Sequence, residues 1–153
     1  MAEAAVATMD VAALNASAAF NRWAGFEVVR TEAGEAELRL PWRADLGQYA
    51  GFLHAAMIAG MIDTACGFAA CTVAGRVLAS HVAVSCLAPA VGDAFVARAR
   101  VVKAGRRQVF ARAELFALRG GEERLVATGD VILVPLAGTA EAAPCPDSEL
   151  RAA

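Results

Sequence analysis

The sequence lacks the features that mark several common classes of protein. Its 14 Lys and Arg residues nearly balance its 16 Asp and Glu residues, and a formal net charge of −2 is not typical of a nucleic-acid-binding protein. It contains only two histidines, and its four cysteines form no CxxC pair. A glycine-rich phosphate loop and a GxSxG motif are also missing. These absences argue against a nucleic-acid partner, a metal cofactor and the common serine-hydrolase arrangement.

The cysteines and the N-terminus indicate a reducing location. Cys66, Cys71 and Cys86 stand in apolar context, and their spacing with Cys145 is not that of a disulfide framework. The first ten residues lack the positive charge that begins a secretory signal. We therefore expect reduced thiols in a cytoplasmic protein.

Apolar residues are in excess, at 58 % of the 153 residues. A domain of this length buries roughly two thirds of its unfolded surface, so association is expected to cover part of the remainder. The longest apolar run, 51–73, is long enough to span a membrane. However, Asp63 lies in its middle, and no Lys or Arg stands between Arg43 and Arg76 to anchor its ends. We expect a homo-oligomer that does not enter a membrane.

The order of the predicted elements indicates an α+β fold. A helix is predicted over 10–25, a hairpin of strands over 26–31 and 36–40, a central helix from 53 or 54 to 74, and four strands over 77–87, 94–103, 108–118 and 124–134. Strands on both sides of one apolar helix predict an antiparallel sheet wrapped around that helix. We expect a single domain over 10–136, between flexible segments at 1–9 and 137–153.

Asp63 is the most informative residue of the central helix, because a carboxylate in an apolar helix is costly unless something satisfies it. Small neighbours on the helical wheel would leave space in front of it for a substrate or for another subunit's backbone. Those neighbours are Ala56, Ala59, Gly60, Cys66, Gly67 and Ala70. A purely structural role, in which Asp63 bonds a backbone group or an arginine, remains open.

His54 lies at the predicted helix start, where unsatisfied N–H groups can receive a developing oxyanion. Nine residues separate it from Asp63, which is half a turn out of phase in a regular helix. The two can share a site only if His54 precedes the helix body, and a simple capping role explains its position equally well. The side-chain amide of Gln48, shortly before the helix, can orient water or a carbonyl.

Five arginines gather around one predicted hairpin. They form either an ordinary solvated face or a contact for an anionic ligand such as a nucleotide phosphate. These arginines are Arg98, Arg100, Arg106, Arg107 and Arg112.

Several short motifs follow one another along the chain. They are QYAGFLHAA at 48–56, DTA at 63–65 with Gly67, SCLAP at 85–89, Gly92, and Gly-Arg at 105–106. Together they resemble the hotdog-fold thioesterases, and most of all the PaaI-like acyl-CoA thioesterases. That family has the pattern Asn-x-x-Gly-x-x-His-Gly-Gly, followed by a helix with Asp-x-Ala-x-Gly. The resemblance covers roughly residues 20–135 and implies a hotdog fold with no cofactor.

The resemblance also implies roles for individual residues. Asp63 matches the catalytic acid, which acts as a nucleophile or as a general base on water. The backbone N–H of Ala55 matches the oxyanion donor, and His54 matches the residue that helps to hold the thioester carbonyl. Gln48 takes the place of an Asn that positions the carbonyl or the water.

The same resemblance implies an acyl-CoA substrate and active sites at the interface of a homodimer, or of a tetramer built as a dimer of dimers. Four further residues are expected to contact the substrate, two in the motif before the helix and two on the basic hairpin, near the CoA phosphates. They are Gly51, Ala56, Arg106 and Arg107.

The chain departs from the family pattern at the helix start. Ala55-Ala56 replaces Gly-Gly, so each Cβ narrows the approach and removes easy access to positive φ. Gln48 reaches about one methylene further than Asn. Two other functions therefore remain open: a hydratase or dehydratase of enoyl thioesters on the same fold, and a non-catalytic acyl-CoA binding protein.

Overall fold

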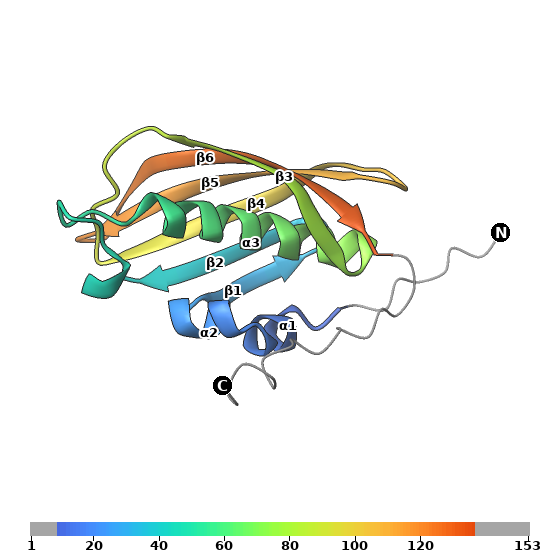
Figure 1. The fold of residues 1–153 in the computed structure, drawn as a ribbon, viewed down its shortest axis with the longest axis horizontal. Coiled ribbons are helices and arrows are strands. Elements are labelled where there is room, and N and C mark those ends of the chain that lie inside the picture. Colours follow the sequence, from blue (N-terminus) through green and yellow to red (C-terminus); the bar gives the residue numbers. More distant parts are fainter. Residues whose placement is uncertain (1–8, 137–153) are drawn as a thin grey trace, which may run out of the picture.

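A computed structural model of the chain describes residues 9–136. One antiparallel sheet has the strand order β1-β2-β4-β5-β6-β3, and the helix α3 lies across one of its faces (Figure 1). The strands are β1 (Glu27–Glu32), β2 (Glu35–Pro41), β3 (Val77–Cys86), β4 (Ala94–Ala104), β5 (Val109–Arg119) and β6 (Glu122–Pro135). The helices are α1 (Val11–Ser17), α2 (Ala19–Ala24) and α3 (Ala55–Ala74), with a 3-10 turn η1 at Ala44–Leu46. The predicted α+β hotdog fold is confirmed; the predicted flexible segments, except Met9, and Cys145 lie outside the described residues.

The single helix predicted over 10–25 is wrong, because the structure has two helices that meet at Ala18. The backbone of Ala18 is extended, with φ −80° and ψ 118°. A guanidinium N–H of Arg22 donates to the carbonyl oxygen of Ser17 at 2.8 Å, so a side chain satisfies a carbonyl that the break exposes. Asp10 is the N-cap of α1, since its Oδ1 accepts the N–H of Ala13 at 2.9 Å.

Buried apolar and exposed polar residues alternate along the strands, which gives the sheet one apolar face, and α3 packs against that face. Along β5, Ala113 and Leu115 are buried while Arg112 and Glu114 face outward. Small residues let the helix come close: a Cβ on Gly129 of β6 would lie 2.6 Å from the side chain of Ile62. The largest fully buried side chains include Phe95, Leu38, Leu40, Met61, Ile62 and Leu115.

The helix α3 has the length and hydropathy of a candidate membrane span. It nevertheless buries ten of its residues within the fold, as the core helix of a soluble protein does. Its buried side carries bulky residues, among them Ile58, Met61 and Ile62. That the chain does not enter a membrane stays a prediction.

Strand β3 forms one edge of the sheet, next to β6 (Figure 1). Of its ten residues, Val77 and Val84 are half-buried and the others are exposed. The side of β3 that faces away from β6 is paired with no strand among residues 9–136. An uncovered edge of this length is a surface on which another strand can pair.

Candidate functional site

The start of α3 is held by hydrogen bonds to two separate loops. The N–H of Leu53 donates to the carbonyl of Ala90 at 3.0 Å, and the N–H of His54 donates to the carbonyl of Leu46 at 3.0 Å. Leu46 and Leu53 are buried in the core. The first turn of the helix therefore has a fixed position relative to the sheet.

His54 is the N-cap of α3 and lies outside the helix body, with an extended backbone. Its ring nitrogen Nδ1 accepts the N–H of Ala56 at 3.0 Å, so in this conformation the ring carries its proton on Nε2. The N–H of Ala55 has no hydrogen-bond partner among the described residues. One amide of the first turn is thus satisfied by the cap, and its neighbour is free at the positive end of the helix dipole.

The replacement of Gly-Gly by Ala55-Ala56 causes no backbone strain. Within residues 9–136, every residue with positive φ is a glycine, so both alanines have negative φ. They are the first two residues of α3, and a backbone N–H group is present whether the residue is glycine or alanine. The expected loss of access to positive φ therefore has no effect on the geometry of this helix start.

Gln48 belongs to a tight turn that precedes α3. The N–H of Gly51 donates to the carbonyl of Gln48 at 2.9 Å, and the N–H of Ala50 donates to the side-chain oxygen of Gln48. The side-chain NH2 group of Gln48 has no acceptor in the described part of the chain and is left as a donor. Gly51 has φ +80°, a conformation that favours glycine, which explains why this residue type stands in the motif.

A cavity of about 400 Å³ opens at the start of α3. Gln48 and Ala55 both line it, so the fold brings together two of the predicted site residues. Its other walls include Ile58 and the segment from Cys86 to Ala90. The sequence assigned no role to that segment, although its SCLAP motif was part of the family resemblance.

Asp63 lies half-buried in the middle of α3. No hydrogen bond or ion pair reaches its carboxylate from the described residues, and burial raises its pKa above the ordinary value. The interpretation in which Asp63 only bonds a backbone group or an arginine thus finds no support among residues 9–136. Burial, and then the charges of Asp63 and Asp130, raise the pKa of the Cys66 thiol to about 12, so this cysteine remains a neutral thiol.

The small residues around Asp63 leave only part of the space beside its carboxylate open. Cys66 and Ala70 turn toward the core and are buried. One turn before Asp63, the ring of Phe20 packs over Gly60, 3.3 Å from the position that a Cβ would take. The sequence did not indicate this aromatic neighbour, because α2 is distant from α3 along the chain.

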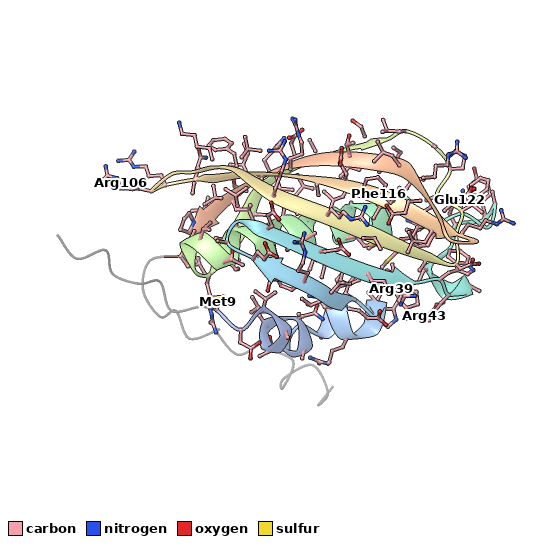
Figure 2. The ribbon with its side chains drawn as sticks, turned by 180° about the vertical axis from the view of Figure 1, so that it is seen from behind. Met9, Arg39, Arg43, Arg106, Phe116 and Glu122 are labelled. Atoms are coloured by element: carbon pink, nitrogen blue, oxygen red, sulfur yellow. The ribbon has the colours of Figure 1, made fainter. Side chains whose placement is uncertain are left out.

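One chain does not bring all the predicted residues together. Ala55 and Asp63 are eight residues apart within α3, which corresponds to about 12 Å along the helix axis. A single thioester carbonyl cannot touch both groups across that distance. The basic hairpin is also remote: Arg106, at the tip between β4 and β5, lies at the end of the sheet opposite the start of α3 (Figures 1 and 2).

The described residues contain no group of three or more His, Cys, Asp or Glu side chains that could hold a metal ion.

Three of the five predicted arginines differ in their partners. Arg98 forms ion pairs with Glu37 and Glu123, and Arg112 forms one with Asp130, whereas Arg100 has no ion pair within residues 9–136.

Comparisons with known proteins agree with the fold and the motifs. A family model described as the thioesterase superfamily matches residues 50–123. A thioesterase family protein from Silicibacter pomeroyi has 37% sequence identity and a TM-score of 0.81; the match covers 84% of this chain and 96% of that one. No curated protein sequence matches the chain.

Two solved structures of PaaI proteins are also similar. A point mutant of the phenylacetic acid degradation protein PaaI from Thermus thermophilus has 27% identity and a TM-score of 0.69, covering 76% of this chain and 98% of that one. The E. coli PaaI protein, from the phenylacetic acid degradation operon, has 20% identity and a TM-score of 0.76, covering 83% and 91%. These neighbours are consistent with the PaaI-like branch that the motifs indicated. The chain belongs to the hotdog-fold thioesterase superfamily.

Proposed function

We propose that the protein hydrolyses acyl-CoA thioesters, with Asp63 of one chain and the start of α3 of a second chain forming each active site. The observation that carries the proposal is the pair of unused groups on α3. The Asp63 carboxylate is half-buried without a partner among residues 9–136, and the Ala55 N–H is free. A partly desolvated carboxylate is a stronger base than an exposed one. A free N–H at a helix start is a suitable donor to an oxyanion.

A second chain is required because these two groups lie about 12 Å apart within one helix. The exposed edge strand β3 is the proposed contact: its sequence, VLASHVAVSC, contains no Lys, Arg, Asp, Glu or Pro to discourage pairing. Two copies of β3 that pair antiparallel about a two-fold axis join the two sheets into one. The two α3 helices then lie on the same face, and each Asp63 approaches the partner's helix start.

In the proposed reaction, water attacks the carbonyl carbon of the thioester and Asp63 accepts its proton. Alternatively, the Asp63 carboxylate attacks first and water hydrolyses the resulting anhydride. In both routes the partner's Ala55 donates its N–H to the carbonyl oxygen, which becomes negative in the tetrahedral intermediate. His54 Nε2–H and the NH2 group of Gln48 are the remaining donors for the carbonyl or the water. The C–S bond then breaks, the CoA thiolate takes up a proton, and the carboxylic acid is released.

The partner also supplies the proposed CoA contacts. Antiparallel pairing of β3 reverses the partner's direction, so its β4–β5 hairpin points toward the end of the sheet where the first chain's α3 begins. Arg106 and Arg107 at that hairpin can then meet the CoA phosphates. Gly51 and Ala56 border the thioester at the helix start. We expect the reaction to take place in the cytoplasm.

A panel of acyl-CoA substrates, aromatic and short or medium aliphatic, tests the proposal. Wild type should release CoA from at least one member well above background, and Asp63→Asn should not. Equal rates in the two proteins would remove Asp63 from the mechanism. Product analysis with an enoyl thioester separates hydrolysis from hydration, because hydration leaves the thioester intact. Saturable binding without turnover across the whole panel would instead indicate a non-catalytic binding protein.

A further inference from the structure

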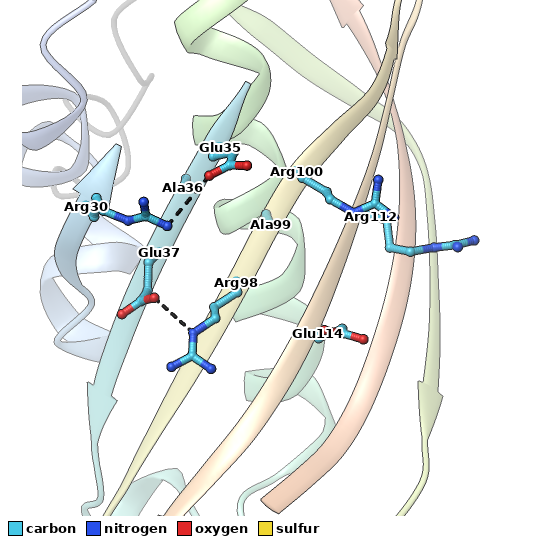
Figure 3. Close-up of a pocket in the computed structure, with 9 residues that line it drawn as sticks. All are labelled: Arg30, Glu35, Ala36, Glu37, Arg98, Ala99, Arg100, Arg112 and Glu114. Carbon is cyan, nitrogen blue, oxygen red and sulfur yellow. Dashed lines mark hydrogen bonds and ion pairs between the residues drawn. The ribbon is translucent and has the colours of Figure 1, made fainter. Parts of the chain in front are cut away.

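The outer face of the sheet, opposite α3, carries two adjacent cavities. One of about 300 Å³ is lined mainly by charged residues of β2, β4 and β5 (Figure 3). The other, of about 470 Å³, lies over β4, β5 and β6. Arg100 and Arg112 line both cavities and therefore stand at the boundary between them.

The larger cavity has an apolar floor. Val102 and Phe110 are 56% and 38% exposed, and Ile132 beside them is half-buried. The register of β4 against β5 shifts between Val101 and Lys103, so a bulge interrupts the regular surface there. A volume of this size is in the range of small-molecule sites.

The charges at the two cavities differ. In the smaller cavity, Arg98 pairs with Glu37 at 2.9 Å and Arg30 pairs with Glu35 at 3.6 Å. Glu35 is also the cross-strand neighbour of Arg100, yet its ion pair is with Arg30. The charges of Arg30 and Arg98 are therefore balanced by glutamates, and the smaller cavity is the less favourable site for an anionic ligand.

At the larger cavity the positive charge is not balanced. Arg100 stands directly opposite Arg112 across β4 and β5, an arrangement of like charges that is unfavourable in a sheet. Arg112 is neutralised by Asp130, with Nε and Oδ1 2.8 Å apart. Arg100 and Lys103 have no ion-pair partner among the described residues, and Asp130 is the only carboxylate in the lining. An anion beside Arg100 would balance a positive charge that no described residue pairs.

We propose that this outer cavity binds a small amphipathic anion, with its carboxylate or phosphate at Arg100 and its apolar body over Val102 and Phe110. A second copy of the chain is a poorer occupant, because a two-fold contact here would bring Arg100 and Lys103 of both chains close together. The cavity lies on the opposite face of the sheet from α3. The proposal therefore stands independently of the catalytic role of Asp63.

Titration of the 15N-labelled full chain, followed by NMR, tests this inference. The probes are octanoate and octyl phosphate, which distinguish the two headgroups, and octanol, which has the same chain without charge. Saturable shifts are expected at the amides of Val102, Phe110 and Ile132 with at least one anion, and much weaker binding with octanol. Arg100→Gln should weaken anion binding about tenfold or more, because a hydrogen bond to a charged group is lost.

Two controls make the result decisive. Arg119→Gln removes an exposed arginine at the far end of β5 and should leave the affinity unchanged, as should Asp63→Asn. The proposal is overturned if no anion gives saturable shifts on the outer face, if octanol binds as tightly as the anions, or if Arg100→Gln matches wild type. Shifts confined to α3 would also overturn it, because they would place the anion at the candidate active site; the other outcomes do not bear on thioester hydrolysis.

Discussion

Replacing Ala55 by proline is predicted to remove the oxyanion donor while leaving the fold intact. Ala55 is the first residue of α3, the position at which proline is best tolerated in a helix. The residue before a proline must be extended, and His54 already has φ −64° and ψ 140°. Since the N–H of Ala55 is free within the described chain, no hydrogen bond of the fold is lost.

The expected loss is therefore one of rate. Removing one oxyanion donor costs about 10²–10³-fold in kcat, or roughly 2.7–4 kcal/mol of transition-state stabilisation. Thermal unfolding should remain close to that of wild type, because proline at a compatible position does not destabilise a protein. The assay is CoA release under saturating acyl-CoA, together with an unfolding curve for each variant.

Ala55→Val is the matched control, since it adds comparable bulk and retains the N–H. It should lose far less activity than Ala55→Pro. If the proline variant keeps the wild-type kcat, or if valine is as damaging as proline, the Ala55 amide is not the oxyanion donor. A proline variant that unfolds would show instead that the helix start differs from this geometry.

Three further predictions concern the carboxylate, the edge strand and the core. Because burial raises the pKa of Asp63 and only the ionised group can act, kcat/KM should fall through one protonation as pH decreases, at a pH above the range of an exposed aspartate. Val82→Lys on β3 should weaken the dimer in sedimentation experiments, since Val82 is 40% exposed in one chain and association can bury that part, an apolar contact worth roughly 0.6–1.2 kcal/mol in each chain; Val29→Lys on the opposite edge strand should not. Gly129→Ala should destabilise the fold by about 1–3 kcal/mol, because its Cβ would overlap the facing helix, whereas Gly67→Ala on the helix meets no atom closer than 3.9 Å and should not destabilise it.

Each of these has an outcome that contradicts it. If kcat/KM falls at the pH expected for an exposed carboxylate, Asp63 is fully solvated in the assembly. A Val82→Lys protein that remains dimeric would move the interface away from β3. Equal unfolding midpoints for wild type and Gly129→Ala would show that the helix lies farther from β6 than the structure places it.

The strands and the central helix could be predicted because local patterns specify them. Alternation along 94–103 and 108–118 corresponds closely to β4 and β5, and the apolar run to Gly75 gives α3 its end. The break at Ala18 could not be predicted in this way. Alanine favours helices and no Gly or Pro marks the interruption, so tertiary contacts must override the local preference there.

For the candidate site, the sequence identified the groups but not their arrangement. His54 and Asp63 stand out as the two residues of an apolar run that can carry charge. The cavity shared by Gln48 and Ala55 depends on the turn before α3 and on the segment after β3, which are distant in sequence. Similarly, the arginines look alike in the sequence, yet strand register gives Arg98 and Arg112 partners and leaves Arg100 without one in the described part of the chain.

The most direct test of the shared active site is to mix two inactive variants. Asp63→Asn and Ala55→Pro chains are each purified, combined in equal amounts, dissociated and reassembled. If each site takes its carboxylate from one chain and its N–H from the other, half of the dimers are mixed and each mixed dimer has one intact site, so about a quarter of the wild-type activity should return. If both groups act from the same chain, every site remains defective and the mixture stays as inactive as its components.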